Sequence, residues 1–221
     1  SGYYNAEIEP GVTIQLRAGG PAVGYQPPSS LLYQDPSILM GMVSHDNSLG
    51  SSASAPVVGV VSPIYASPIG LMWPSDVYDF DELSDIGESD ATVLMFGSSA
   101  FVTWLKGTGM VREEQIDGSF DGSPSRFIVE GDVVQQNFVT NEPYMYENVI
   151  EDWGGRPISY LLAADFGWEA YPGVGSLSVR PEVLEEEADC LAVLVPMIQQ
   201  AAVDFTNDMY PVMQTVVNIA P

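Results

Sequence analysis

The chain has 221 residues, of which 46% are hydrophobic, and this composition excludes a disordered acidic tail. Thirty Asp and Glu residues outnumber six Lys and Arg residues, so the formal net charge at pH 7 is -24. So few cations cannot neutralise a row of phosphates or an anionic lipid surface, which excludes nucleic acid and the membrane surface as partners. The acidity fits a solvated surface that keeps the protein soluble, or a high-salt habitat, and the sequence leaves both open.

Apolar runs in this chain, such as residues 55–61 and 69–73, are too short to cross a bilayer. No basic segment followed by an apolar one opens the chain, so we expect that any export signal is absent or already removed. These patterns predict a soluble chain that meets the membrane only through a permease or a lipid anchor outside it. Cys190 is the single cysteine, which excludes a disulfide framework, and its apolar neighbours predict a small core residue.

In chain order, apolar and β-branched runs predict strands at residues 12–16, 38–43, 57–61 and 69–73. The last three runs are apolar throughout, which favours sheets covered on both faces. The segment 21–36, rich in Pro, Ser and Tyr, carries no assignable element.

From residue 79 onwards, helices and strands alternate. We expect an amphipathic turn at 79–86, a strand at 91–96 and a helix from 100 to 106 that stops at Gly107. Next come a strand at 133–139, a helix at 143–153, strands at 158–164 and 177–179, and a helix from Pro181 to Val203 that kinks at Pro196. This alternation predicts an α/β fold with mainly parallel sheets flanked by helices.

Five short segments, taken in this order and spacing, resemble solute-binding proteins of the nitrate, sulfonate, taurine and thiamine-pyrimidine-precursor type. They are Gly2-Tyr3-Tyr4 with the 12–16 strand and Gly19-Gly20, residues 40–46, residues 68–72 with the 81–83 turn, residues 96–109, and residues 129–132 with 139–143. The resemblance implies a two-lobed periplasmic-binding-protein-like fold with a ligand cleft between the lobes. It places lobe one at residues 1–72 plus 168–221 and lobe two at residues 73–167. The family's proteins are longer, which leaves two interpretations open: this chain is a fragment of such a fold, or unresolved residues are absent from it.

The segment Gly97-Ser98-Ser99 follows a predicted strand and opens a predicted helix. Serine hydroxyls and free backbone N–H groups at that position lie where ligands bind in open α/β sheets. The alternative is that a serine only caps the helix. The resemblance favours ligand binding by all three residues.

Ser44, His45 and Asp46 also follow a predicted strand, and His45 is the only histidine. Neighbouring residues on a strand point to opposite faces, and no second histidine completes a typical metal site. We therefore predict no metal site and no catalytic residue here. Turn chemistry and ligand contact both remain open for this cluster.

Asn141 and Glu142 follow the predicted 133–139 strand and precede Pro143. Helix initiation is one interpretation, with Asn141 as the cap and Pro143 in the first turn. In the resembling family this region faces the cleft, which implies that Asn141 and Glu142 contact the ligand.

Aromatic residues gather near the presumed crossovers between the lobes, around residues 66–74 and 165–175. Trp73, Phe166 and Trp168, with Asp165 beside them, either join the core or stack on a planar or cationic ligand. Tyr65 and Tyr171 belong to the same set.

The function predicted from these features is extracytoplasmic capture of a small molecule and its delivery to the permease of an ABC importer, without a cofactor and without catalysis. None of the six basic residues falls in a segment assigned to the cleft, so a neutral or cationic ligand, aromatic nitrogen-containing molecules included, is favoured over an anion. Two alternatives stay open: an enzyme on the same fold, of the thiamine-pyrimidine or menaquinone-pathway type, and a structural or surface protein of a salt-adapted organism. The first of those enzymes is expected to contain a cysteine-rich iron-binding motif, which a single cysteine cannot supply, and the second needs an acid–base residue, for which His45 is the only histidine candidate.

Overall fold

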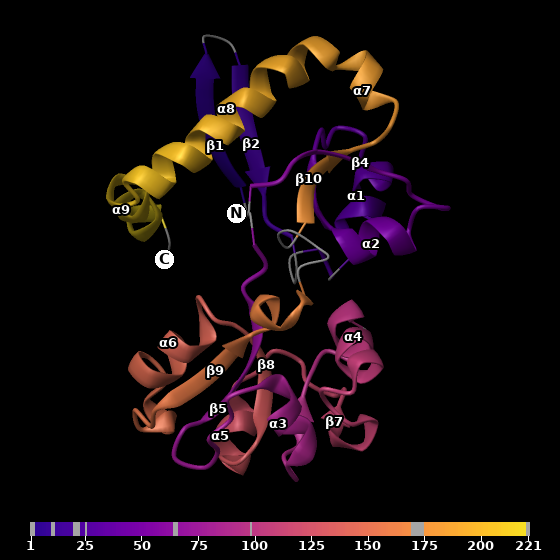
Figure 1. Cartoon of the computed structure of the whole chain (residues 1–221). Coiled ribbons are helices and arrows are strands. Elements are labelled where there is room, and N and C mark those ends of the chain that lie inside the picture. The colour runs from indigo at the N-terminus through magenta and orange to yellow at the C-terminus, as the bar shows by residue number, and fades with distance from the viewer. Residues whose placement is uncertain are drawn as a thin grey trace. The chain divides into compact units, whose positions relative to one another are not determined.

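A computed structural model describes residues 3–9, 12–19, 23–24, 26–63, 66–97, 99–168 and 175–219 (Figure 1). The chain forms two compact units: Ser1–Pro63 with Gly175–Pro221 (unit 1), and Ile64–Val174 (unit 2). The predicted boundary after residue 72 would divide a strand that pairs on both of its edges inside unit 2. Each unit is described by itself below.

Unit 2 is built on a five-stranded mixed sheet with the strand order β7-β6-β8-β5-β9. Its strands are β5 (Ile69–Pro74), β6 (Val93–Leu94), β7 (Ile116–Asp117), β8 (Val134–Phe138) and β9 (Ile158–Leu162). β6 runs parallel to β7 and β8, whereas β5 runs antiparallel to β8 and β9. The expectation of mainly parallel sheets is therefore correct for three strands only, because apolar runs do not encode strand direction.

Short helices connect the strands of unit 2. They are α3 (Leu83–Glu88), α4 (Ala100–Thr108), α5 (Ser125–Glu130) and α6 (Glu142–Asn148), with 3-10 turns at Glu113–Gln115, Glu151–Trp153 and Ala163–Phe166. α4 continues through Gly107 and ends at Gly109, whose φ of 74° is a left-handed cap. The predicted stop at Gly107 was wrong, because a helix tolerates glycine and ends where the backbone turns left-handed.

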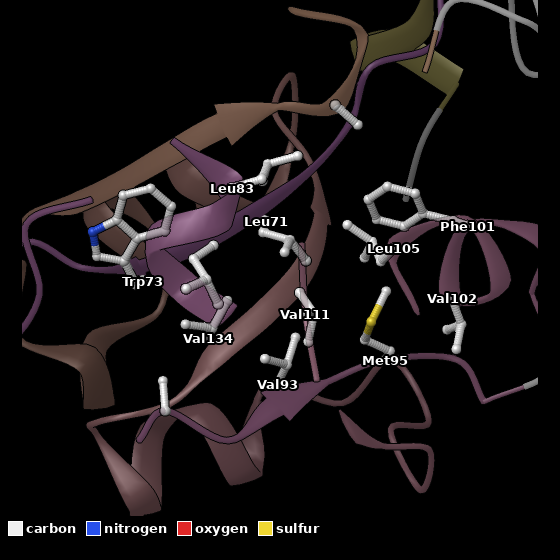
Figure 2. Packing of buried hydrophobic residues seen from close by; sticks show 13 residues of the cluster. Leu71, Trp73, Leu83, Val93, Met95, Phe101, Val102, Leu105, Val111 and Val134 are labelled. Carbon is white, nitrogen blue, oxygen red and sulfur yellow. The ribbon is translucent and has the colours of Figure 1, made fainter. Parts of the chain in front are cut away.

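Hydrophobic clusters cover both faces of the unit 2 sheet. One joins Leu71, Trp73 and Val134 of the sheet to Phe101 and Leu105 of α4 (Figure 2). The other places Met72 and Leu94 against side chains that include Phe127, Tyr146 and Trp153. The prediction of a doubly covered strand at residues 69–73 is thus confirmed, since β5 is buried from Gly70 to Pro74.

Unit 1 contains a two-stranded hairpin and a three-stranded antiparallel sheet of order β3-β10-β4. Its strands are β1 (Tyr3–Glu9), β2 (Val12–Arg17), β3 (Gly41–Ser44), β4 (Val58–Val61) and β10 (Gly175–Val179). Its helices are α1 (Pro28–Gln34), α2 (His45–Gly50), α7 (Val183–Glu186), α8 (Ala188–Asn207) and α9 (Tyr210–Ile219). α1 fills the segment left unassigned from sequence, and Pro28 opens it, where a missing N–H costs nothing.

Among the described residues of unit 1, Val179, Val183 and Leu191 form a small buried cluster, with partly buried residues packed around them. Leu32 and Val43 are fully buried in the same unit. β4 was expected to be covered on both faces, but Val58 and Gly59 are exposed. The sheet has three short strands, so too little surface packs on it to cover both faces.

Helices α8 and α9 carry many exposed apolar side chains, among them Val203, Met213 and Val217. Pro196 lies inside α8, as the sequence predicts, and Cys190 is exposed rather than buried. α8 is long and apolar enough to cross a membrane by length and composition, a property that the shorter apolar runs did not reveal.

Candidate functional site

The carboxyl ends of β6, β7 and β8 lie at one edge of the unit 2 sheet, because these three strands run parallel. The chain leaves this edge through the loop to α4, the turn after β7 and the turn to α6 (Figure 1). In open α/β sheets, ligands bind beside the carboxyl ends of the strands. The candidate site is this edge, termed the carboxyl edge, with the described residues 95–97, 99, 117–120 and 136–142.

Gly97 brings two loops of the carboxyl edge into close contact. A Cβ atom at Gly97 would lie 3.0 Å from both the Cα and the carbonyl oxygen of Gly118. The backbone next to it is also linked across the edge by a bridge between Phe96 and Ser119. Gly97 thus fixes the shape of the edge, and a side chain at this position would separate the loops.

Ser99 is the N-cap of α4, and its hydroxyl accepts a hydrogen bond from the Val102 N–H at 3.3 Å. This is the capping role that was open from sequence. The hydroxyl stays beside the first turn of the helix, at the carboxyl edge. Ser98, the third residue of this predicted site, lies outside the described residues.

Three consecutive amide side chains, Gln135, Gln136 and Asn137, are buried in β8. Gln135 Oε1 accepts from the Tyr146 hydroxyl at 3.2 Å, and Gln136 Oε1 accepts from the Phe96 N–H at 3.4 Å. Burial raises the pKa of Tyr146 to about 12, so this hydroxyl remains a proton donor at neutral pH. The first two amides therefore have defined partners.

Asn137 differs from its neighbours, because its Nδ2 and Oδ1 atoms are both buried and neither has a hydrogen-bond partner among the described residues. Asn137 as a whole is only 3% exposed. A buried amide without partners costs roughly 1–3 kcal/mol of stability, and such groups are uncommon in folded proteins. Asn137 is thus the most unusual polar side chain of the carboxyl edge.

The neighbours of Asn137 follow from the strand register. Gly70 of β5 pairs with Asn137. A Cβ at Gly70 would lie 3.3 Å from Asn137 Oδ1 and 3.1 Å from a methyl group of Val139. The Asn137 amide and the aliphatic Val139 side chain therefore both lie close to Gly70.

Phe96 and Phe138 are exposed aromatic residues of this edge, and Phe96 is the more exposed of the two. The Phe96 ring is tilted against Phe120, with 4.9 Å between the ring centres, and the residue is 45% exposed. Gly122, with a φ of 87°, passes beside the ring. An exposed ring at the same edge as a buried amide offers both apolar and polar contacts to a small molecule.

The charge of Asp117 at the carboxyl edge is paired with Arg126 of the neighbouring helix α5. Asp117 accepts from the N–H and hydroxyl of Ser119 at 2.9 and 2.6 Å and from Arg126 at 2.8 Å. These hydrogen bonds, those of Ser119 first, lower the pKa of Asp117 to about 2. Arg126 also pairs with Glu130 at 2.8 Å, so two carboxylates neutralise this guanidinium.

Asn141 ends the turn from β8 to α6 and Glu142 begins that helix, both at the carboxyl edge. Asn141 occupies the N-cap position of α6 without a side-chain capping bond, and Pro143 lies in the first turn. Glu142 Oε2 accepts from the Phe138 N–H at 2.8 Å. The carboxylate thus holds the turn after β8, and the exposed Asn141 side chain remains the more accessible of the two.

Ser44, His45 and Asp46 belong to unit 1, whereas the residues of the carboxyl edge belong to unit 2. Ser44 ends β3 and is the N-cap residue of α2, while His45 and Asp46 form the first turn of that helix. The expectation that the last two extend a strand needs correction, since both are helical. Asp46 Oδ1 accepts from the Asn47 N–H at 2.8 Å, which is local turn chemistry.

Trp73 belongs to the core, which corrects its assignment as a ligand contact. It lies in the buried cluster of Figure 2 and is 1% exposed. Its indole N–H donates to the Tyr78 carbonyl at 3.1 Å, and its ring meets Phe80 edge-on at 5.0 Å. A side chain that is covered and fully hydrogen-bonded has no surface left for a ligand.

Asp165, Phe166 and Trp168 lie in and just after the 3-10 turn that follows β9. Phe166 and Trp168 pack against the core, and Trp168 contacts Phe101 and Trp104 of α4 at ring-centre distances of 5.4 and 5.1 Å. Asp165 is exposed. Packing on α4 is therefore the observed role of these rings, and Tyr65 and Tyr171 lie outside the described residues.

Sequence reasoning missed Phe96, Gln136 and Asn137 as site residues. The available signal was the run Gln135-Gln136-Asn137 inside a predicted buried strand, where polar amides are unexpected unless they have a partner. Within the described ranges, no three His, Cys, Asp or Glu side chains gather closely enough to hold a metal ion.

Comparison with known proteins gives a structural likeness without a sequence relationship. No protein family and no curated protein matches the sequence. Among solved structures, the periplasmic aliphatic sulphonate-binding protein SsuA from Escherichia coli is similar, with a TM-score of 0.57 and 12% identity. The match covers 82% of this chain and 58% of SsuA, so the chain spans little more than half of that protein's length. The likeness establishes a periplasmic-binding-protein-like fold.

Proposed function

We propose that this protein binds a small molecule at the carboxyl edge of unit 2, outside the cytoplasm, and delivers it to the permease of an ABC importer. Asn137 carries the proposal, because a buried amide with two unpartnered atoms destabilises the free protein and gains hydrogen bonds when a ligand arrives. The periplasmic-binding-protein-like fold, shared with a protein whose role is binding, supports the same conclusion. Capture between two lobes and the extracytoplasmic location remain predictions from the sequence resemblance.

The chemistry of the carboxyl edge favours binding over catalysis. Asp117 and Arg126 bind each other, and Glu142 is held by a backbone N–H. The single histidine, His45, lies in unit 1. With its charged groups already engaged, this edge is better suited to hold a molecule than to transfer its protons.

Thermal unfolding of the whole chain against a panel of small metabolites tests the proposal. A ligand that binds the folded state raises the melting temperature in proportion to the logarithm of its concentration. We expect at least one compound to do so and to emerge chemically unchanged after prolonged incubation. A panel without any shift, or turnover of the bound compound, would contradict the proposal.

Two variants test whether the ligand binds at the carboxyl edge. Phe96→Ala removes an exposed ring from the carboxyl edge, and we expect it to weaken binding at least tenfold. Val129→Ala, at a position 83% exposed on α5 of the same unit, is the matched control and should bind as the unchanged protein does. Equal binding by both variants would exclude this edge as the site.

A further inference from the structure

Resting on the proposed function, we infer that the ligand is a neutral, planar molecule in which a hydrogen-bond donor and acceptor lie side by side, such as a carboxamide or a lactam. The inference comes from the hydrogen-bonding capacity of Asn137 and from its neighbours. It specifies the chemical class of the ligand, which the fold does not.

An asparagine amide offers donors at Nδ2 and acceptor lone pairs at Oδ1, and in Asn137 both atoms are unpartnered. A sulfonate or carboxylate has acceptors only, so it would satisfy Nδ2 and leave Oδ1 facing other oxygen lone pairs. An ammonium group has donors only, so it would satisfy Oδ1 and leave Nδ2 unpaired. A group with both, held in one plane, satisfies the two atoms together.

The electrostatics of the carboxyl edge point the same way. Arg126 of α5, which pairs with Asp117 of this edge, is also bound by Glu130. Its guanidinium is therefore not available to an anion. With a formal net charge of -24, the whole chain also opposes the approach of an anionic ligand. An anion held only by neutral groups in such a field gains little from binding.

The planar shape follows from Phe96. Its ring belongs to the same carboxyl edge as Asn137, 45% of the residue is exposed, and the ring packs against Phe120. A flat molecule can stack on such an exposed ring while its polar edge turns toward the amide. Because both polar atoms of Asn137 are buried, the ligand reaches them only when neighbouring side chains move.

A test uses three probes that share one aromatic ring: benzamide, which has a donor and an acceptor, benzenesulfonate, which has acceptors only, and benzylamine, which has donors only. Binding of each probe to the whole chain is measured by calorimetry. We expect benzamide to bind at least tenfold more tightly than the other two. Benzenesulfonate or benzylamine binding as tightly as benzamide would overturn the inference.

The variant Asn137→Leu separates a ligand-binding amide from a structural one. Because it removes an unpaired buried amide, we expect it to raise the melting temperature of the ligand-free protein by about 2–4 °C while weakening benzamide binding at least tenfold. Gln135→Leu is the matched control in the same strand. It removes the partner of the Tyr146 hydroxyl and should lower the melting temperature without changing which probe is preferred.

Asn137→Val serves if the leucine variant does not fold, since valine is smaller and suits a strand. Benzamide binding unchanged in the folded variant would overturn the inference. If none of the three probes binds but another panel compound does, binding of that compound to the variant decides by the same criterion. If no compound of any class binds, the proposed function fails together with the inference. If an anion binds and the Asn137 variant binds it equally well, only the inference is refuted.

Discussion

The central strands of the two larger sheets both contain buried polar side chains, but the hydrogen bonding of Ser178 in one differs from that of Asn137 in the other. In β10 of unit 1, Ser178 is 1% exposed, and its hydroxyl bonds the hydroxyl and carbonyl oxygens of Ser176 at 3.0 and 3.2 Å. In β8 of unit 2, Asn137 has no such partner among the described residues. A satisfied buried group belongs to the architecture, whereas an unsatisfied one indicates a site that awaits a partner.

The units also differ in how much surface surrounds these strands. β8 lies in a sheet covered on both faces, while β10 lies in a three-stranded sheet with one small cluster. An unpaired amide is tolerated where the remaining core is large enough to offset its cost. We therefore expect unit 2 to tolerate the unpaired amide of Asn137 because the unit is well packed. Three predictions test this comparison between the units.

The largest expected effect is that of Leu71→Ala. Leu71 is fully buried in β5, and truncating such a side chain costs roughly 2–5 kcal/mol. Urea unfolding followed by tryptophan fluorescence measures the loss, since Trp73 lies in the same cluster. Val58→Ala, at a residue 37% exposed in β4, is the control and should cost well under half as much. Equal losses would contradict the contrast between the two cores.

Ser178→Ala is expected to have a smaller effect of opposite sign to that of Asn137→Leu. Removing a hydroxyl with local partners costs about 1 kcal/mol or less, whereas removing an unpaired amide stabilises the protein. Urea unfolding of the two ligand-free variants gives both signs. If Asn137→Leu destabilised the protein as Ser178→Ala does, the amide would have a structural partner and the contrast would be lost.

The smallest expected effect is the loss of stability in acid. The pKa of Asp117 in unit 2 is lowered to about 2, chiefly by hydrogen bonds from Ser119, and that of Asp35 in unit 1 is lowered to about 2 by Ser37 and then Arg17. A carboxyl group whose folded pKa lies below its unfolded value stabilises the protein above the unfolded pKa, and that contribution is lost as the pH falls through the folded pKa.

Both carboxylates should therefore lose their contribution between about pH 4 and pH 2. Asp117→Asn and Asp35→Asn should each flatten the decline of melting temperature in that window, by a modest amount because both groups lie near the surface. An unchanged slope in either variant would show that its carboxylate titrates normally in the folded protein.

Much of the fold of unit 2 was predictable from sequence, because long apolar runs and glycine or proline signals mark its elements. The strands at residues 69–74, 134–138 and 158–162 and the start of α4 lie where they were expected. Strand direction was not predictable, since an apolar run looks the same in a parallel and an antiparallel pair. Exposure in unit 1 was misjudged for the related reason that Val58 and Cys190 have apolar neighbours but little packed against them.

For the candidate site, the sequence indicated the edge but not its decisive residue. Gly97, Ser99, Asn141 and Glu142 were predicted from their positions after strands, and the structure places them at the carboxyl edge. Trp73 was assigned to the ligand because an aromatic residue near a crossover looks the same whether it is buried or exposed. Asn137 was missed because its significance lies in the absence of a partner, which only three-dimensional neighbours reveal.

Amide hydrogen exchange of the whole chain, with and without the best-binding panel compound, tests most directly whether the carboxyl edge binds the ligand. The account predicts slower exchange in residues 95–99, 117–120 and 136–142 of unit 2, and loss of this protection in Asn137→Leu. Protection confined to residues 41–50 of unit 1, around Ser44, His45 and Asp46, with no change at the carboxyl edge, would contradict it.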